Sequence, residues 1–86
     1  MTAETVRLCD LKRGERAHVR SLDAASHIRR RLQDIGLEEG AAVECVLVSP
    51  LGDPTAYLIC GAVIALRRED AACVQVRYDM FGRAAI

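Results

Sequence analysis

The chain has 86 residues, of which 51% are hydrophobic, and its 12 Lys and Arg side chains are balanced by 12 Asp and Glu side chains. This length suits one domain, and a formal net charge of zero favours neither nucleic acid nor an anionic membrane as a partner. No apolar run approaches the roughly 20 residues of a membrane span, and the first residues lack the apolar core of a signal peptide. We therefore expect one cytoplasmic domain over residues 1–86, with a loose N-terminus (1–6), a C-terminal tail (79–86) and no direct membrane insertion.

The first elements are expected between residues 8 and 22. Leu8 and Leu11 are three residues apart, which suits one helical turn, or a loop, that places two leucines over a core. Residues Glu15–Leu22 alternate as a strand does, with Ala17 and Val19 on one face and polar side chains on the other.

A helix is predicted from about Ala25 to Ile35. Apolar residues spaced by four and three positions share one face of this helix: Ile28, Leu32 and Ile35. Either Asp23 or Ser26 could cap its first turn, because both side chains accept hydrogen bonds from exposed backbone N–H groups.

Three glycines are assigned to structural turns: Gly36, Gly40 and Gly61. Gly36 follows the helix, where a residue often needs positive φ, and Leu37 is then placed to pack back on Leu32 in a Schellman-type end. Gly40 lies where the chain reverses before the next strand, and Gly61 joins two short strands.

Four further strands are predicted: Ala42–Ser49, Thr55–Cys60, Ala62–Leu66 and Cys73–Tyr78. Residues 67–71 break the apolar pattern and suit one helical turn. Short, closely spaced strands with glycine turns predict a mostly β fold, a small and partly open barrel with one α-helix and a short helical turn.

The hairpin over residues 55–66 is apolar on both faces. One face should fill the barrel: Thr55, Tyr57, Ile59, Ile64 and Leu66. The other face carries Ala56, Leu58, Cys60 and Val63. Because a small barrel covers one face, the second set predicts a contiguous patch that binds another protein or a second copy of the chain, most simply as a two-fold dimer. An internal cover is the alternative, from Leu8 and Leu11 or from Met80, Phe81 and Ile86.

The segment Pro50-Leu51-Gly52-Asp53-Pro54 predicts a rigid loop, since two prolines and a glycine interrupt any strand. It is either a pre-ordered contact loop with Leu51 as its apolar anchor or a plain connection with Leu51 packed on the barrel. The residues assigned to partner binding are Pro50, Leu51, Gly52, Asp53, Pro54, Leu58, Cys60 and Val63.

The cysteines and histidines give no metal motif. Cys9, Cys45, Cys60 and Cys73 are widely spaced, without a C-x-x-C pair. Cys45 shares a predicted core face with Val43 and Leu47, whereas Cys73 shares a solvent face with Gln75 and Arg77. His18 and His27 should meet solvent. We assign no metal ligand and no cofactor, although transient contact with Fe²⁺ or Zn²⁺ stays open.

The basic runs Arg29–Arg31 and Arg67–Arg68 could form a nucleic-acid patch, but no strand offers a pair of aromatic side chains on one face. Neighbouring carboxylates favour a solvated surface with local ion pairs instead. No nucleophile motif, carboxylate pair or phosphate loop is present, so the sequence does not indicate an enzyme.

Three segments together resemble a known family: R-R-L-x-D-x-G-L-x-x-G at Arg30–Gly40, S-P-L-G-D-P at Ser49–Pro54 and G-x-x-x-A-L-R-R-E-D-A at Gly61–Ala71. They resemble the ferrous iron transport protein A (FeoA) family, over about Leu8–Val76. The resemblance implies an SH3-like barrel that carries a helix. It also implies a small cytosolic accessory to a membrane ferrous-iron permease with its own cytoplasmic G-protein domain.

The same module is similar to the C-terminal domain of some metal-dependent repressors. This chain departs from the FeoA pattern in the hairpin, whose outer face is often polar in the family and is apolar here. We expect a non-enzymatic interaction module that binds the permease's cytoplasmic region. The alternatives are a metal-sensing or metal-binding domain that uses Cys and His ligands, and a small nucleic-acid-binding barrel.

Overall fold

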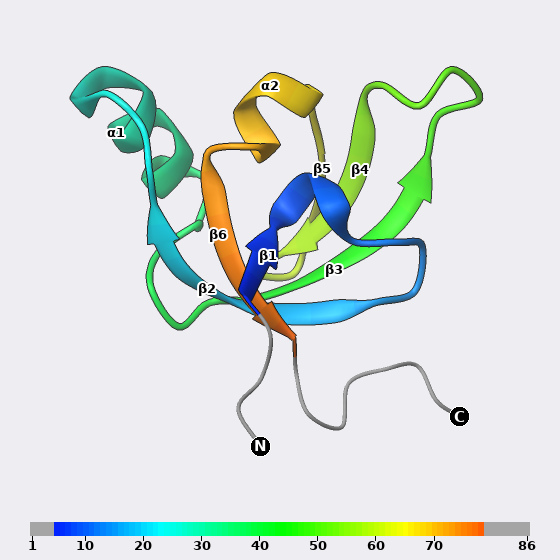
Figure 1. The fold of residues 1–86 in the computed structure, drawn as a ribbon, viewed down its shortest axis with the longest axis horizontal. Coiled ribbons are helices and arrows are strands. Elements are labelled where there is room, and N and C mark those ends of the chain that lie inside the picture. Colours follow the sequence, from blue (N-terminus) through cyan, green and yellow to red (C-terminus); the bar gives the residue numbers. More distant parts are fainter. Residues whose placement is uncertain (1–4, 79–86) are drawn as a thin grey trace.

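The computed structural model describes residues 5–78, which form a six-stranded antiparallel sheet with the strand order β1-β6-β2-β3-β4-β5. In chain order its elements are β1 (Thr5–Arg7), the 3₁₀ helix η1 (Leu8–Asp10), β2 (Arg16–Leu22), α1 (Ser26–Asp34), β3 (Ala42–Val48), β4 (Thr55–Ile59), β5 (Ala62–Leu66), α2 (Arg68–Ala71) and β6 (Val74–Tyr78). The sheet curls into a half-open barrel whose edge strands are β1 and β5, with α1 and α2 along its upper rim in Figure 1. The prediction of a mostly β, partly open barrel is confirmed.

The N-terminal expectation needs correction. Thr5 and Val6 were expected in a loose segment, but they belong to β1, which pairs with β6 and sets Val6 opposite Val76. This pairing joins residues about 70 positions apart in the sequence, so no local pattern marks it. The expected tail, residues 79–86, lies outside the described residues.

The core fills the concave side of the sheet. Its buried hydrophobic residues are Leu8, Leu11, Ala17, Val19, Leu32, Leu37, Val43, Cys45, Tyr57, Ile59, Leu66, Ala71, Val74 and Val76. Leu8 and Leu11 are therefore part of this core and do not cover the hairpin patch. On the inner face of the hairpin, Thr55 and Ile64 are half-buried beside the fully buried Tyr57 and Ile59.

A β-bulge in β3 reverses the expected orientation of Leu47. Cys45 pairs with Tyr57, but the next pair along the ladder is Leu47 with Ala56, so β3 holds one extra residue between them. Leu47 consequently lies on the outer face and is 55% exposed. The prediction that it shares the core face of Val43 was wrong, because alternation holds only in an uninterrupted ladder.

Helix α1 begins after Ala25, which has extended backbone angles and makes no side-chain cap. The expectation of a cap by Asp23 or Ser26 is therefore wrong. The inward face is as predicted: Leu32 is buried and the two isoleucines on its face are half-buried.

The helix ends in a Schellman motif. The Gly36 N–H donates to the Gln33 carbonyl oxygen at 2.9 Å, and the Leu37 N–H donates to the Leu32 carbonyl oxygen at 3.1 Å. Gly36 has φ +105°, which a side chain would disfavour. Leu32 and Leu37 are both buried, so this helix end is joined to the core.

The β4–β5 turn packs against the same helix end. Cys60 was expected to end the strand on the outer face with Leu58, but β4 ends at Ile59 and Cys60 forms a two-residue turn with Gly61. Their φ angles are +49° and +83°, as the tight hairpin geometry requires at both positions. The Cys60 Sγ lies 3.6 Å from the Gly36 carbonyl oxygen. A Cβ on Gly36 would lie 2.6 Å from this sulfur and 3.3 Å from the Ile59 Cγ2 atom. Gly36 thus provides both a backbone conformation and room for the hairpin.

We predict that Gly36→Ala lowers the free energy of unfolding by about 2 kcal/mol or more, whereas Gly40→Ala lowers it by about 1 kcal/mol. Both glycines have positive φ, but a Cβ on Gly40 would meet no atom within 4 Å. Denaturant unfolding of both variants measures the difference. Equal losses of stability in the two variants would mean that the contact of the new Cβ with Cys60 costs nothing. In a Cys60→Gly background, the additional loss of Gly36→Ala over Gly40→Ala should disappear.

Candidate functional site

Over the described part of the chain, side chains that could ligate a metal do not gather in one place. Among residues 5–78, no group of three or more His, Cys, Asp or Glu side chains could hold a metal ion. His18 on β2 and His27 on α1 are both exposed, as predicted. Within the same part of the chain, no helix is both long and apolar enough to span a bilayer.

The Cys45 thiol is fully buried in the core. Burial raises the pKa of this thiol, and the nearby Glu15 and Glu44 carboxylates raise it further. Because metals and electrophiles react with the thiolate, Cys45 is suited to packing rather than to chemistry, as its predicted core position implied.

Cys73 differs from its prediction. It lies just before β6 and is half-buried against the core, with its Sγ placed 3.5 Å from the Glu69 carbonyl oxygen. It was expected on a solvent face with Gln75 and Arg77, but the regular strand begins one residue later, at Val74. Cys60 is the exposed member of the described cysteines.

The basic run on α1 is exposed, as predicted, but its ion pair is not local. The Arg31 Nη2 lies 3.4 Å from the Asp70 Oδ2. This contact joins α1 to α2, whereas sequence spacing had indicated partners within each element.

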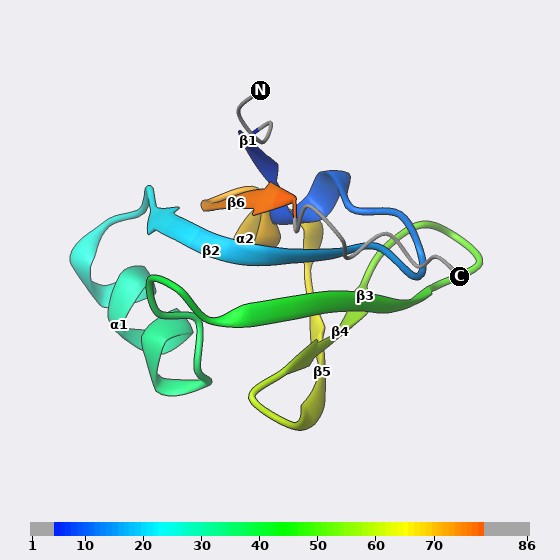
Figure 2. The same cartoon turned by 90° about the horizontal axis from the view of Figure 1, so that it is seen from below.

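The outer side of β3, β4 and β5 carries a continuous apolar surface. Register places Leu58 opposite Val63 on the neighbouring strand, and it places Ala56 between Leu47 and Ala65. Val63 is 62% exposed and Leu58 36%. We call this set the outer apolar face: Leu47, Ala56, Leu58, Val63 and Ala65. Figure 2 looks at this side of the sheet, where the strands follow in the order β6, β2, β3, β4 and β5.

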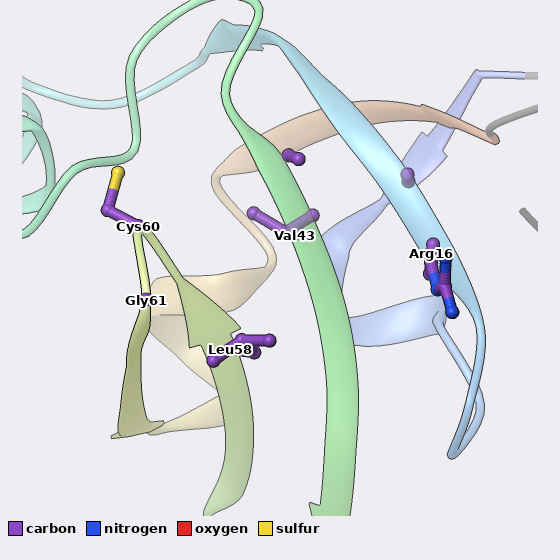
Figure 3. Close-up of a pocket in the computed structure, with 7 residues that line it drawn as sticks. Arg16, Val43, Leu58, Cys60 and Gly61 are labelled. Atoms are coloured by element: carbon purple, nitrogen blue, oxygen red, sulfur yellow. The ribbon is translucent and has the colours of Figure 1, made fainter.

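A hollow of about 260 Å³ lies where the outer apolar face meets β2. Figure 3 shows Leu58 and Arg16 on either side of β3, with Cys60 and Gly61 at the β4–β5 turn. The Arg16 Nε is 3.5 Å from the Glu44 Oε1, so a charged pair borders an otherwise mostly apolar hollow. Its mostly apolar lining is suited to contact with an apolar side chain of a partner.

Sequence reasoning assigned Leu58, Cys60 and Val63 to partner binding and missed Arg16 and Ala42. Both missed residues line the hollow with Leu58. Alternation along β2 marks Arg16 as outward, but its position near the hairpin depends on the pairing of β2 with β3. Local patterns carry no information on that pairing.

The loop between β3 and β4 extends beyond the sheet in Figure 1 and is held by its own hydrogen bonds. The Gly52 N–H donates to the Ser49 carbonyl oxygen at 2.8 Å, and the Ser49 hydroxyl donates to the Pro54 carbonyl oxygen. The Asp53 carboxylate accepts from the Arg68 N–H at 2.9 Å, at the start of α2. Leu51 is 94% exposed, so the interpretation that packed it on the barrel is wrong.

The half-open sheet with a short helix against one end defines a small SH3-like domain, without a cluster of metal-ligating side chains among the described residues. The chain belongs to the FeoA family: the model of the FeoA domain matches residues 6–78. FeoA proteins are accessories of ferrous iron transport. The predicted family and the SH3-like fold are thereby confirmed.

Individual proteins that are similar to this chain also carry FeoA names. A curated fusion of Fe(2+) transport protein A with the Fe(2+) transporter FeoB, from Porphyromonas gingivalis, is 34% identical over 71 residues; these residues make up 83% of this chain but 8% of the relative. The solution structure of FeoA from Chlorobium tepidum is 38% identical with a TM-score of 0.79, covering 85% of this chain and 70% of that one. FeoA from Stenotrophomonas maltophilia, solved with zinc and described as a prokaryotic SH3 domain protein, is 30% identical with a TM-score of 0.74, covering 90% and 93%.

We predict that Asp53→Ala lowers the free energy of unfolding by about 1 kcal/mol, because the Arg68 N–H loses its acceptor. Asp53→Asn keeps a side-chain oxygen and should cost less than half as much. Denaturant midpoints of the two variants measure the contrast. If both substitutions are neutral, the contact between loop and helix does not contribute to stability.

Proposed function

We propose that this chain is a non-enzymatic accessory of ferrous iron uptake that docks on the cytoplasmic region of a membrane ferrous-iron permease. The outer apolar face is the observation that carries this proposal. Contiguous exposed apolar side chains tend to mark protein interfaces, and Leu47, Leu58 and Val63 lie on neighbouring strands. The fused relative supports the choice of partner, since one chain there joins the two proteins.

Burial of this face can supply useful affinity. A fully buried Leu or Val contributes about 1.5–3 kcal/mol relative to full exposure. Leu47, Leu58 and Val63 are only partly exposed in the free domain, so burying each of them contributes a part of this free energy. Specific interfaces usually bury about 800 Å² on each partner. Leu47, opposite Ala56, extends the outer apolar face along β3 toward the exposed Leu51 loop.

The loop is suited to the same role. Its internal hydrogen bonds and its link from Asp53 to α2 hold the backbone around Leu51 before any partner binds. A pre-ordered loop loses little conformational entropy on binding. We therefore keep Pro50, Leu51, Gly52, Asp53 and Pro54 in the proposed partner surface.

A second copy of the chain is the other candidate for covering the face. Strand β5 pairs with β4 and is an edge of the described sheet, so its free backbone groups lie beside Val63 and Ala65. Two copies related by a two-fold axis would cover both the β5 edge and the outer apolar face. Such a dimer would compete with docking on the permease, because both use the same side chains.

We expect Leu58→Lys/Val63→Lys to abolish co-purification with the permease's cytoplasmic region while the domain stays folded. Two buried cations in an apolar contact oppose association. Ser26→Lys/Gln33→Lys is the matched control, because it adds the same charge at exposed positions on α1 and should bind normally. Undiminished capture of the hairpin variant would reject this face as the docking site. Sedimentation of the same proteins tests the dimer, which a wild-type monomer at high concentration would exclude.

Leu51→Ala should weaken binding to the permease's cytoplasmic region by roughly fivefold, since an anchor side chain is lost from the contact. Its effect on stability should be below about 0.5 kcal/mol, because an exposed side chain contributes little to the folded state. Titration and thermal unfolding measure the two effects separately. Lost stability with normal binding would remove the loop from the proposed surface.

A further inference from the structure

The other half of the outer sheet is basic. The exposed side chains of β1, β6 and β2 include Arg7, Arg77, His18 and Arg20. Register sets Thr5, Arg77 and His18 in one row across the three strands, and it sets Arg7 opposite Gln75 in the next row. Residues from both ends of the described chain therefore form one surface, which we call the basic half.

A second β-bulge adds to this surface. In the pairing of β2 with β6, Val19 faces Val76 but Ser21 faces Gln75, so β2 has one extra residue between these pairs. That residue is Arg20, which is exposed together with Ser21. Alternation from the inward Val19 already places Arg20 outward, so the effect of the bulge is to place Ser21 outward beside it.

The charge of the basic half is not neutralised by ion pairs within residues 5–78. The ion pairs of this region are Arg16–Glu44 and Arg31–Asp70, and neither includes a residue of the basic half. Glu39 is the carboxylate that shares a hollow with His18, Arg20 and Arg77. The basic half thus gathers three arginines on neighbouring strands, Arg7, Arg20 and Arg77, and such a concentration of positive charge attracts an external anion.

The basic half and the outer apolar face meet at the hollow beside Leu58. The row of Arg77 and His18 ends at Ala42 of β3, and Ala42 lines the hollow together with Arg16 and Leu58. One continuous surface thus changes from cationic to apolar across the strands.

We infer that this surface recognises an acidic segment of a partner protein, with one apolar side chain in the hollow and carboxylates over Arg77 and Arg7. This inference rests on the proposed function, because the segment is taken to belong to the permease's cytoplasmic region. From β6 to β4 there are three strand spacings, about 14 Å. An extended segment spans that distance in about four residues and a helix in about nine, which sets the separation of the carboxylates from the apolar residue.

Other anionic partners fit this surface less well. Proteins that bind single-stranded nucleic acid stack bases on aromatic side chains, but Tyr57 is 1% exposed on the inner face, and Tyr78 is half-buried opposite the inward Ala17. A phosphate chain has no apolar group to fill the hollow.

The test measures binding to the purified cytoplasmic region of the ferrous-iron permease from the same organism, at low and at high salt. Arg7→Glu/Arg77→Glu should weaken binding about tenfold at low salt and remove most of its salt dependence. Arg29→Glu/Arg30→Glu makes the same charge change at exposed positions on α1 and should bind as the wild type does. Circular dichroism confirms that each variant is folded.

The outcomes separate the two proposals. If the wild type binds and the reversal at positions 7 and 77 changes nothing, the inference is overturned while docking on the permease stands. If the wild type does not bind the permease region, the proposed function fails. A synthetic peptide of three glutamates, a four-residue Gly-Ser spacer and a leucine then decides the inference.

Peptide binding that needs both the basic half and Leu58 supports the inference, and its absence overturns it. Tighter binding to phosphatidylserine vesicles or to a single-stranded oligonucleotide, with the same dependence on Arg7 and Arg77, also overturns it in favour of that partner.

Discussion

A sheet of six strands has two sides, and the described chain covers one of them. The core residues, the 3₁₀ turn and α2 fill the concave side, while α1 is joined to one end through Leu32, Leu37 and the contact of Gly36 with Cys60. A domain this small buries a modest share of its surface, and little of residues 5–78 remains to cover the convex side. The side chains on the convex side are therefore available for recognition, and their composition indicates what kind of partner the domain binds.

Two β-bulges shape that outward side. The bulge in β3 moves Leu47 from the core to the outer apolar face, and the bulge in β2 places Ser21 outward beside Arg20 in the basic half. The Arg16–Glu44 pair lies on the boundary between the two halves. Bulges are known to redirect side chains near functional sites. Here they act on both halves, which supports a single binding surface with an apolar and a cationic part.

Local patterns predicted the helix, most strands and both faces of the hairpin except at Cys60, because alternation holds along each strand and ends at the turn that Cys60 forms with Gly61. They failed for Leu47, where a bulge interrupts alternation, and for Thr5, whose partner Arg77 lies at the far end of the chain. The basic half was missed for a different reason. A net charge of zero averages over the molecule, whereas the charges are gathered by a strand order that the sequence does not reveal.

The pairing of β1 with β6 also determines how this domain can be attached to other proteins. Thr5 and Tyr78 lie on adjacent strands at one edge of the sheet, and β5 forms the opposite edge. Tyr78 also pairs with Ala17, which lines the hollow, so the C-terminal end of the described chain lies near the proposed binding surface. In a fused arrangement, a short linker would hold the domain near its target at an effective concentration on the order of millimolar. A weak docking surface is sufficient under that condition, whereas a separate chain with the same surface must rely on affinity or abundance.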